Sequence, residues 1–139
     1  MYFERANKKT GLPEMEAIVH ITIDLDLSVL KFDVDMNSVP TPYLDGYEVV
    51  AMFHAHNFDN NQTFWTDSNG LDMQERILNH RSYYNITERV YNLINNNITA
   101  NFYPINSALA MRDGQRQFTV MNDRAQAGSA LNPGSIELM

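Results

Sequence analysis

Apolar and polar residues alternate regularly in the first quarter of the chain. Between positions 19 and 29 the odd positions are apolar and the even positions polar, as in a strand with one buried and one solvated face. At Leu30 the phase reverses, and the even positions of 30–36 are apolar. A single strand over 19–36 would span roughly 60 Å, well beyond the usual length. Because no Gly, Pro or Asn lies at the reversal, we expect a β-bulge or a crossing between two sheets rather than a tight turn.

Shorter segments of the same kind follow, separated by turn-forming residues. The segments that predict strands are 48–55, 63–66, 100–105, 109–112, 117–121 and 135–139. Asp113-Gly114 is a hairpin signal, residues 129–134 predict a loop, and 71–78 is ambiguous between helix and strand. The pattern therefore predicts an all-β fold, a β-sandwich.

The strand pattern continues to the last residues, 136–139, and no cap or polar tail follows it. We therefore expect residues 1–139 to form a single partial domain, a sandwich truncated at both ends. At least one strand should then lack its neighbour and expose apolar side chains. The apolar face of 19–36 in particular needs a partner sheet to cover it.

Composition and charge exclude several classes of function. With 139 residues the chain has the size of one domain. The net charge is −7 and the basic residues are scattered, so we expect no nucleic-acid partner. The apolar runs are far shorter than a membrane span, so we expect no membrane partner. The absence of cysteine excludes disulfides and thiolate metal sites.

Two features bear on the cellular compartment. The first residues lack the basic-then-apolar order of a signal peptide. Three glycosylation sequons, at Asn61, Asn85 and Asn97, nevertheless favour a secretory compartment. Because a glycan cannot be buried, we expect all three asparagines on loops or exposed strand positions.

Two groups of residues have the chemistry of a metal or catalytic site. His54 and His56 would lie on one face of a strand as half of a zinc site, but no third ligand follows at a convincing spacing. Four carboxylates are of the type that glycosidases use, yet their alternation with apolar residues places them on a solvated sheet face. They are Asp24, Asp26, Asp33 and Asp35. We expect no catalytic, cofactor-binding or metal-binding residue in this chain.

The segment Asp67-Ser68-Asn69-Gly70 has calcium-ligand chemistry, but it lacks the spacing of an EF-hand loop. A turn explains the same residues, with Asp67 capping backbone amides and Gly70 at a positive φ. We therefore interpret it as structural.

The dipeptide Asp123-Arg124 follows a predicted strand. A bidentate ion pair there could fix a corner of the fold or contact a neighbouring domain. We interpret it as a structural or domain-contact pair.

Three blocks in series resemble the α-mannosidases of glycoside hydrolase family 38. They are 64–76 (Phe-Trp-Thr-Asp-Ser-Asn-Gly-Leu-Asp-Met-Gln-Glu-Arg), 101–106 (Asn-Phe-Tyr-Pro-Ile-Asn) and 123–131 (Asp-Arg-Ala-Gln-Ala-Gly-Ser-Ala-Leu). Their order and gaps also match, and the resemblance extends from about residue 44 to the C-terminus. Trp65 stands where the family usually has Tyr.

The resemblance implies both a fold and a function. Family members carry a zinc ion, a carboxylate nucleophile and a general acid in an N-terminal catalytic domain, and they retain anomeric configuration. The three blocks lie in a C-terminal, mutarotase-like β-sandwich that buttresses that domain. The expected function is therefore that of a non-catalytic fragment of a lysosomal-type α-mannosidase, acting on mannose-containing glycans in the lysosome or secretory pathway. The zinc belongs to the catalytic domain, which is the expected partner.

Two alternatives remain open. A free-standing carbohydrate-binding β-sandwich could use Trp65 and Tyr103 as a platform on which sugar rings stack. A secreted structural module could assemble through its sheet edges.

Overall fold

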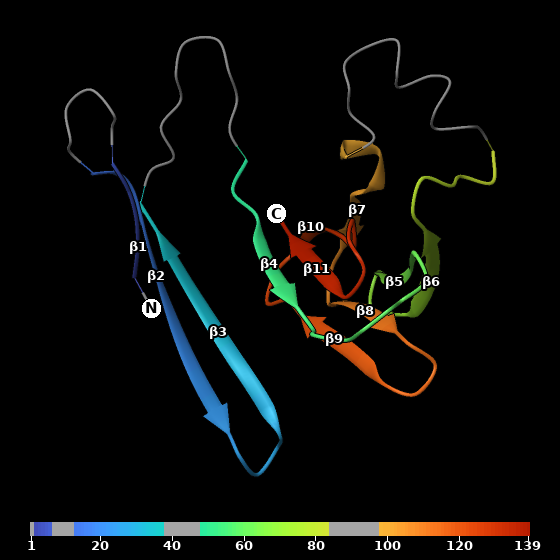
Figure 1. Cartoon of the computed structure of the whole chain (residues 1–139), viewed down its shortest axis with the longest axis horizontal. Coiled ribbons are helices and arrows are strands. Elements are labelled where there is room, and N and C mark those ends of the chain that lie inside the picture. Colours follow the sequence, from blue (N-terminus) through green and yellow to red (C-terminus); the bar gives the residue numbers. More distant parts are fainter. Residues whose placement is uncertain (1, 7–12, 38–47, 84–97) are drawn as a thin grey trace, which may run out of the picture. The chain divides into compact units, whose positions relative to one another are not determined.

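The computed structural model describes residues 2–6, 13–37, 48–83 and 98–139 of the chain. They belong to two compact units, residues 1–49 and 50–139. The strands of both units pair in an antiparallel manner, and the described residues contain no α-helix (Figure 1). The predicted all-β class is confirmed.

The first unit is a three-stranded sheet of order β1-β2-β3. Its strands are β1 (Tyr2–Ala6), β2 (Pro13–Asp24) and β3 (Val29–Met36). The register joins Ile21 with Phe32 and Ile23 with Leu30. Because paired positions add up to an odd number, odd positions of β2 and even positions of β3 share one face. The phase reversal in the sequence is a consequence of this register.

The expectation of a bulge or a sheet crossing in this stretch is wrong, because a tight turn at 25–28 joins the two strands. The Asp24 carboxylate accepts hydrogen bonds from the backbone N–H groups of Asp26 and Leu27, both at 3.0 Å. Ser28 has a φ of 53°, in the left-handed region. Asp and Ser therefore form a turn for which Gly or Asn is the more usual sequence signal.

The second unit contains two four-stranded sheets, of order β4-β11-β10-β7 and β6-β5-β8-β9. A single 3-10 turn, η1 (Thr99–Asn101), precedes β7. The strands are β4 (Ala51–His54), β5 (Thr63–Ser68), β6 (Asp72–Ile77), β7 (Tyr103–Ile105), β8 (Ala108–Arg112), β9 (Gln117–Met121), β10 (Gln126–Ser129) and β11 (Ser135–Leu138).

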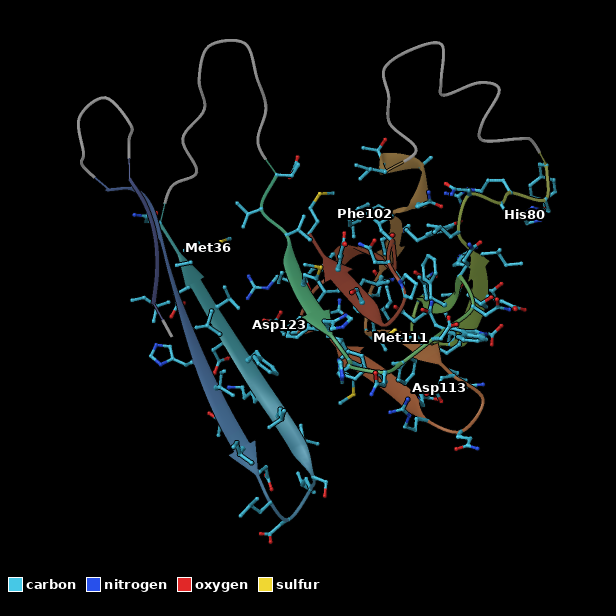
Figure 2. All side chains as sticks on the ribbon, viewed as in Figure 1. Met36, His80, Phe102, Met111, Asp113 and Asp123 are labelled. Carbon is cyan, nitrogen blue, oxygen red and sulfur yellow. The ribbon has the colours of Figure 1, made fainter. Side chains whose placement is uncertain are left out.

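The core of this unit lies between its two sheets. Phe64, Leu109 and Met111 contribute to it from one sheet, and Ile105 and Ile136 contribute from the other. All five side chains are completely buried, and Figure 2 shows Met111 among the crowded side chains of this unit. Two sheets that pack their apolar faces together define a β-sandwich, as the alternation predicts.

The strand predictions hold in this unit, apart from residues 71–78, the start of 100–105 and the strand β10. The ambiguous stretch 71–78 is a strand, β6, and the first residues of 100–105 form η1 instead of a strand. The predicted Asp113-Gly114 turn closes the β8–β9 hairpin, with Gly114 at a φ of 89°. Strand β10 has the sequence Gln-Ala-Gly-Ser, which lacks the bulky alternating residues that identify a strand. Its neighbours impose the extended conformation.

The last strand of the chain lies inside a sheet. β11 pairs with β10 on one side and with β4 on the other, so both of its edges are hydrogen-bonded. The large exposed apolar side chains of the first unit lie along β2, β3 and the turn between them.

Candidate functional site

Asp67 joins two turns of the sandwich. It lies in β5 with only 6% of its surface exposed. Its Oδ1 accepts hydrogen bonds from the backbone N–H groups of Asn106 (2.7 Å) and Ser107 (3.0 Å), and its Oδ2 accepts one from Gly70 (2.9 Å). Gly70 has a φ of 70°, and Asn69 Oδ1 accepts a hydrogen bond from Asn106 Nδ2 at 2.8 Å. The turn after β5 is thereby tied to the turn between β7 and β8.

Backbone hydrogen bonds stabilise the negative charge of the Asp67 carboxylate. Burial by itself raises its pKa, but the backbone hydrogen bonds from Ser107, Gly70, Ala108 and Asn106 outweigh burial and hold the pKa well below its usual range. Ser68, the next residue, is exposed and ends β5. Since backbone amides donate to both carboxylate oxygens, Asp67 ties two turns of the fold together.

Two arginines converge on a single buried tyrosine, Tyr103 of β7. The guanidinium carbon of Arg81 lies 3.9 Å from the centroid of the tyrosine ring, and that of Arg76 lies 4.4 Å from it. Phe64 meets the same ring edge-on, with the ring centroids 5.7 Å apart. Arg76 Nε donates to Thr66 Oγ1 at 3.0 Å, so this arginine is also held from β5.

A depression lies where the segments 78–79 and 98–101 meet. Asn79 and Asn101 bond reciprocally: Asn79 N donates to Asn101 Oδ1 at 2.8 Å, and Asn101 Nδ2 donates to Asn79 Oδ1 at 2.9 Å. Arg81 Nη2 donates to the carbonyl oxygen of Ala100 at 2.7 Å. The depression has a volume of about 200 Å³ and is lined by Leu78, Asn79, Ile98, Asn101 and Leu131.

Sequence reasoning missed this cluster. Arg76 and Tyr103 lie inside two of the family-like blocks, but their isolated positions give no sign that they meet. The contact depends on pairing β6 with β5 and on the sandwich that brings β7 opposite them. Tyr103 is only 4% exposed, so it cannot form the sugar-stacking surface considered above.

Glu137 is a second buried acid that the sequence did not single out. It is 9% exposed, and burial raises its pKa. Its neighbours in register are Ser129 on β10 and Met52 on β4. Because neither neighbour is a carboxylate, the register does not form the acid pair that glycoside hydrolysis uses.

The two histidines lie on different elements and not together on one strand. β4 ends at His54, and His56 lies in the turn that follows. His54 Nδ1 lies 2.9 Å from Ser135 Oγ on the adjacent strand. Within the described ranges no three His, Asp or Glu side chains are placed to hold a metal. These residues therefore do not fit the zinc ion that the family resemblance implies for a catalytic domain.

The four acidic residues of the first unit lie in solvent. Asp24 and Asp26 belong to the turn region of the hairpin, and Asp33 and Asp35 lie on β3. All four are exposed, and Asp33 forms an ion pair with Lys31 at 3.0 Å. The prediction that these side chains are solvated is confirmed, although Asp26 lies in the turn and not on a sheet face.

The remaining predicted positions lie on the surface or outside the described residues. Asn61 is exposed in the turn before β5, whereas Asn85 and Asn97 lie outside the described residues. Arg124 Nη2 lies 2.8 Å from Asp123 Oδ2, in a loop between β9 and β10, with the two side chains 77% and 74% exposed. No helix of the described part of the chain is long and apolar enough to span a membrane.

Residues 50–139 thus form an all-β sandwich whose turns are tied by hydrogen bonds, and this arrangement defines the class of the domain. Residues 6–139 match the family model described as the C-terminal domain of glycosyl hydrolases family 38. The chain belongs to this family.

Named relatives agree with this assignment. Lysosomal alpha-mannosidase of Felis catus is 36% identical over 102 residues, covering 72% of this chain and 9% of that protein. The Bos taurus protein of the same name is 37% identical over 102 residues, covering 72% of this chain and 10% of its own length. The Homo sapiens protein of that name is 32% identical over 110 residues, covering 79% and 10% respectively. The chain thus spans about a tenth of the length of these relatives.

Proposed function

We propose that the chain is a non-catalytic part of a lysosomal-type α-mannosidase, where it buttresses the catalytic domain and contributes no active site of its own. The family match over residues 6–139 carries this proposal. The intact enzyme would hydrolyse terminal α-mannosides of glycans, with its zinc ion and catalytic carboxylates in the other domain.

The chemistry of the sandwich supports a structural role. Retaining glycosidases need two carboxyl groups about 5–5.5 Å apart, one as nucleophile and one as general acid. Asp67 is bonded to four backbone amides, and Glu137 has no carboxylate beside it in register. The acids Asp113 and Asp123 are each paired with an arginine.

An activity assay tests the absence of an active site. We expect the purified chain not to hydrolyse an aryl α-mannoside, with or without added zinc, under conditions in which an intact family member is active. Zinc-dependent turnover that disappears in a His54→Ala, His56→Ala double variant would refute the proposal.

A graft tests the buttressing role. Residues 48–139 would replace the matching region of an intact lysosomal alpha-mannosidase, with and without the core substitution Ile136→Ala. We expect the substitution to lower the yield and thermal stability of the grafted enzyme while leaving the turnover per folded molecule unchanged. A change in turnover at constant yield and stability would indicate a direct catalytic role instead.

We also propose that the parent enzyme passes through the secretory pathway. The exposure of Asn61 and the lysosomal relatives support this proposal. When the chain is expressed with a secretion signal, a glycosidase-sensitive mass increment should be lost in Asn61→Gln. No increment at Asn61 would contradict the proposal at this site.

Asp123 and Arg124 are the surface pair that we propose contacts the catalytic domain. Their loop is anchored because Asn122 Nδ2 donates to the carbonyl oxygen of Ile105 at 3.3 Å. Arg124→Ala should leave the melting temperature of the chain unchanged and lower that of the grafted enzyme. Equal melting temperatures of the two grafted proteins would remove the pair from the interface.

A further inference from the structure

The cluster around Tyr103 carries two positive charges in a confined space. Both guanidinium carbons lie within 4.4 Å of the centroid of one ring that is almost fully buried. The negative face of an aromatic ring attracts a cation, and this accounts for each arginine separately. It does not account for two, because the two like charges repel each other across the same ring.

Among the described residues, no acid is paired with either arginine. Within the described ranges, the ion pairs are Lys31–Asp33, Arg116–Asp113 and Arg124–Asp123, and neither Arg76 nor Arg81 takes part in one. Each of the two donates a hydrogen bond to a neutral oxygen instead, Thr66 Oγ1 or the carbonyl of Ala100.

The hydrogen-bonding capacity of Arg81 is also unfilled. Its Nε is buried and has no hydrogen-bond partner among the described residues. A buried N–H without an acceptor is costly, and the cost is larger for a charged group. The chain as a whole has a net charge of −7, so acids are not scarce, yet none of the acids that the structure describes forms an ion pair with Arg76 or Arg81.

Other arginines that stack on aromatic rings differ in this respect. Arg116 lies over Phe58 and is paired with Asp113. Arg112 lies over Trp65, alone on its ring and exposed to water, and donates to Gln117 Oε1 at 2.8 Å. A single cation that is paired or hydrated therefore needs no further partner, unlike the two at Tyr103.

We propose that Arg76 and Arg81 form a binding site for an oxyanion, a carboxylate or a phosphate. Guanidinium groups match both anions through paired N–H donors, and water-poor surroundings strengthen such bonds. The depression of about 200 Å³ is lined by Asn79, two residues before Arg81, and by Asn101, next to its acceptor Ala100, and it offers room for the group that bears the anion. The site does not depend on the proposed role in an α-mannosidase.

Anion titration of the chain tests the site. Inorganic phosphate, acetate and chloride would be compared at constant ionic strength, so that general screening is the same in all three. The primary signal is the Nε–H resonance of Arg81 in ¹H–¹⁵N NMR spectra, assigned from the spectrum of Arg81→Lys. We expect a saturable shift with phosphate or acetate and none with chloride. Phosphate alone indicates a phosphate-bearing ligand, whereas acetate as well indicates a carboxylate.

Variants then locate the binding. Arg76→Gln and Arg81→Gln should each weaken anion binding about tenfold or more, because each removes one charged fork. Arg112→Gln and Arg124→Gln, the matched controls with a solitary or a paired arginine, should bind as the wild type does. If a variant at the site fails to fold, the wild-type titration decides by itself. The absence of a saturable shift, or an equal loss in the control variants, would overturn the proposal.

Discussion

The two units of the chain have the same kind of strand but a different outcome for their apolar side chains. In the first unit, β2 and β3 gather apolar residues on one face, and most of these side chains are exposed. They are Ile21 (46%), Ile23 (63%), Leu30 (55%), Phe32 (37%), Val34 (44%) and Met36 (46%). In the second unit, Phe64, Leu109 and Ile136 are each 0% exposed.

The difference shows that alternation makes a face but does not bury it. A sheet has to pack its apolar face against a second layer, and the sandwich has such a layer in its own residues. The second unit also has polar ties between its turns, centred on Asp67. The Asp24 carboxylate ties only its own exposed turn.

The largest difference should appear when the same side chain is truncated in both units. Ile136→Ala removes a fully buried side chain and should cost about 3 kcal/mol of unfolding free energy. Ile21→Ala removes a half-exposed one and should cost well under about 1 kcal/mol. Urea unfolding followed by the fluorescence of Trp65 measures the first effect, and far-UV circular dichroism measures both. Equal losses would mean that the face of β2 and β3 is covered in solution.

The two capping aspartates give a second comparison. Asp67→Asn removes the charge that four backbone amides stabilise and should cost about 2 kcal/mol. Asp24→Asn, at an exposed turn, should cost about 0.5 kcal/mol. Urea titrations of both variants against wild type measure these costs.

The charge of Asp67 also predicts a dependence on pH. Since its folded pKa lies below the unfolded value of 3.8, its contribution is complete above pH 3.8 and is lost as the pH falls toward the folded pKa. Wild type should lose this increment on acidification, and Asp67→Asn should not. An acid transition of the same steepness in both proteins would assign it to other groups.

Glu137 should give the opposite dependence of stability on pH. Burial raises its folded pKa above the unfolded value of 4.5, so the native state holds the proton more tightly. Stability therefore falls as the pH rises from the unfolded pKa through the folded pKa. Glu137→Gln should therefore stabilise the second unit by about 1 kcal/mol at neutral pH. The gain should vanish below about pH 4, where the carboxyl is protonated in both states. If Glu137→Gln were less stable than wild type at pH 7, the charge of Glu137 would have a stabilising partner.

The smallest effect on stability, with a clear effect on the surface, is expected on the apolar face of the first unit. Leu30→Ser should have little effect on the unfolding free energy and should reduce the binding of a hydrophobic dye and the tendency to associate. Thr22→Ser, on the opposite face of the same hairpin, is the matched control. Light scattering after size-exclusion chromatography and dye fluorescence report the result. Unchanged dye binding in Leu30→Ser would place the exposed surface elsewhere.

Local pattern was sufficient for the strands and several turns. Strands depend on period-two alternation and on turn residues, and both are visible in single segments such as 19–24, 117–121 and Asp113-Gly114. The three blocks in series were sufficient for the family, which the match over residues 6–139 confirms. The hairpin turn at 25–28 was missed because its signal is the Asp24 carboxylate, which accepts hydrogen bonds from the backbone just after it. The alternating leucines of the turn also continue the strand pattern.

Tertiary packing alone decided the contacts between distant segments. The turn at Asp67 could be predicted locally, but its bonds to Asn106 and Ser107 require β5 and β8 to be neighbours. The convergence of Arg76 and Arg81 on Tyr103 likewise has no trace in spacing, because it joins opposite layers of the sandwich. β10 is a strand only because β11 and β7 pair with it on both sides. Hydrogen bonds and charges act through space, so a side chain's partners follow from the layer that faces it and not from its position along the chain.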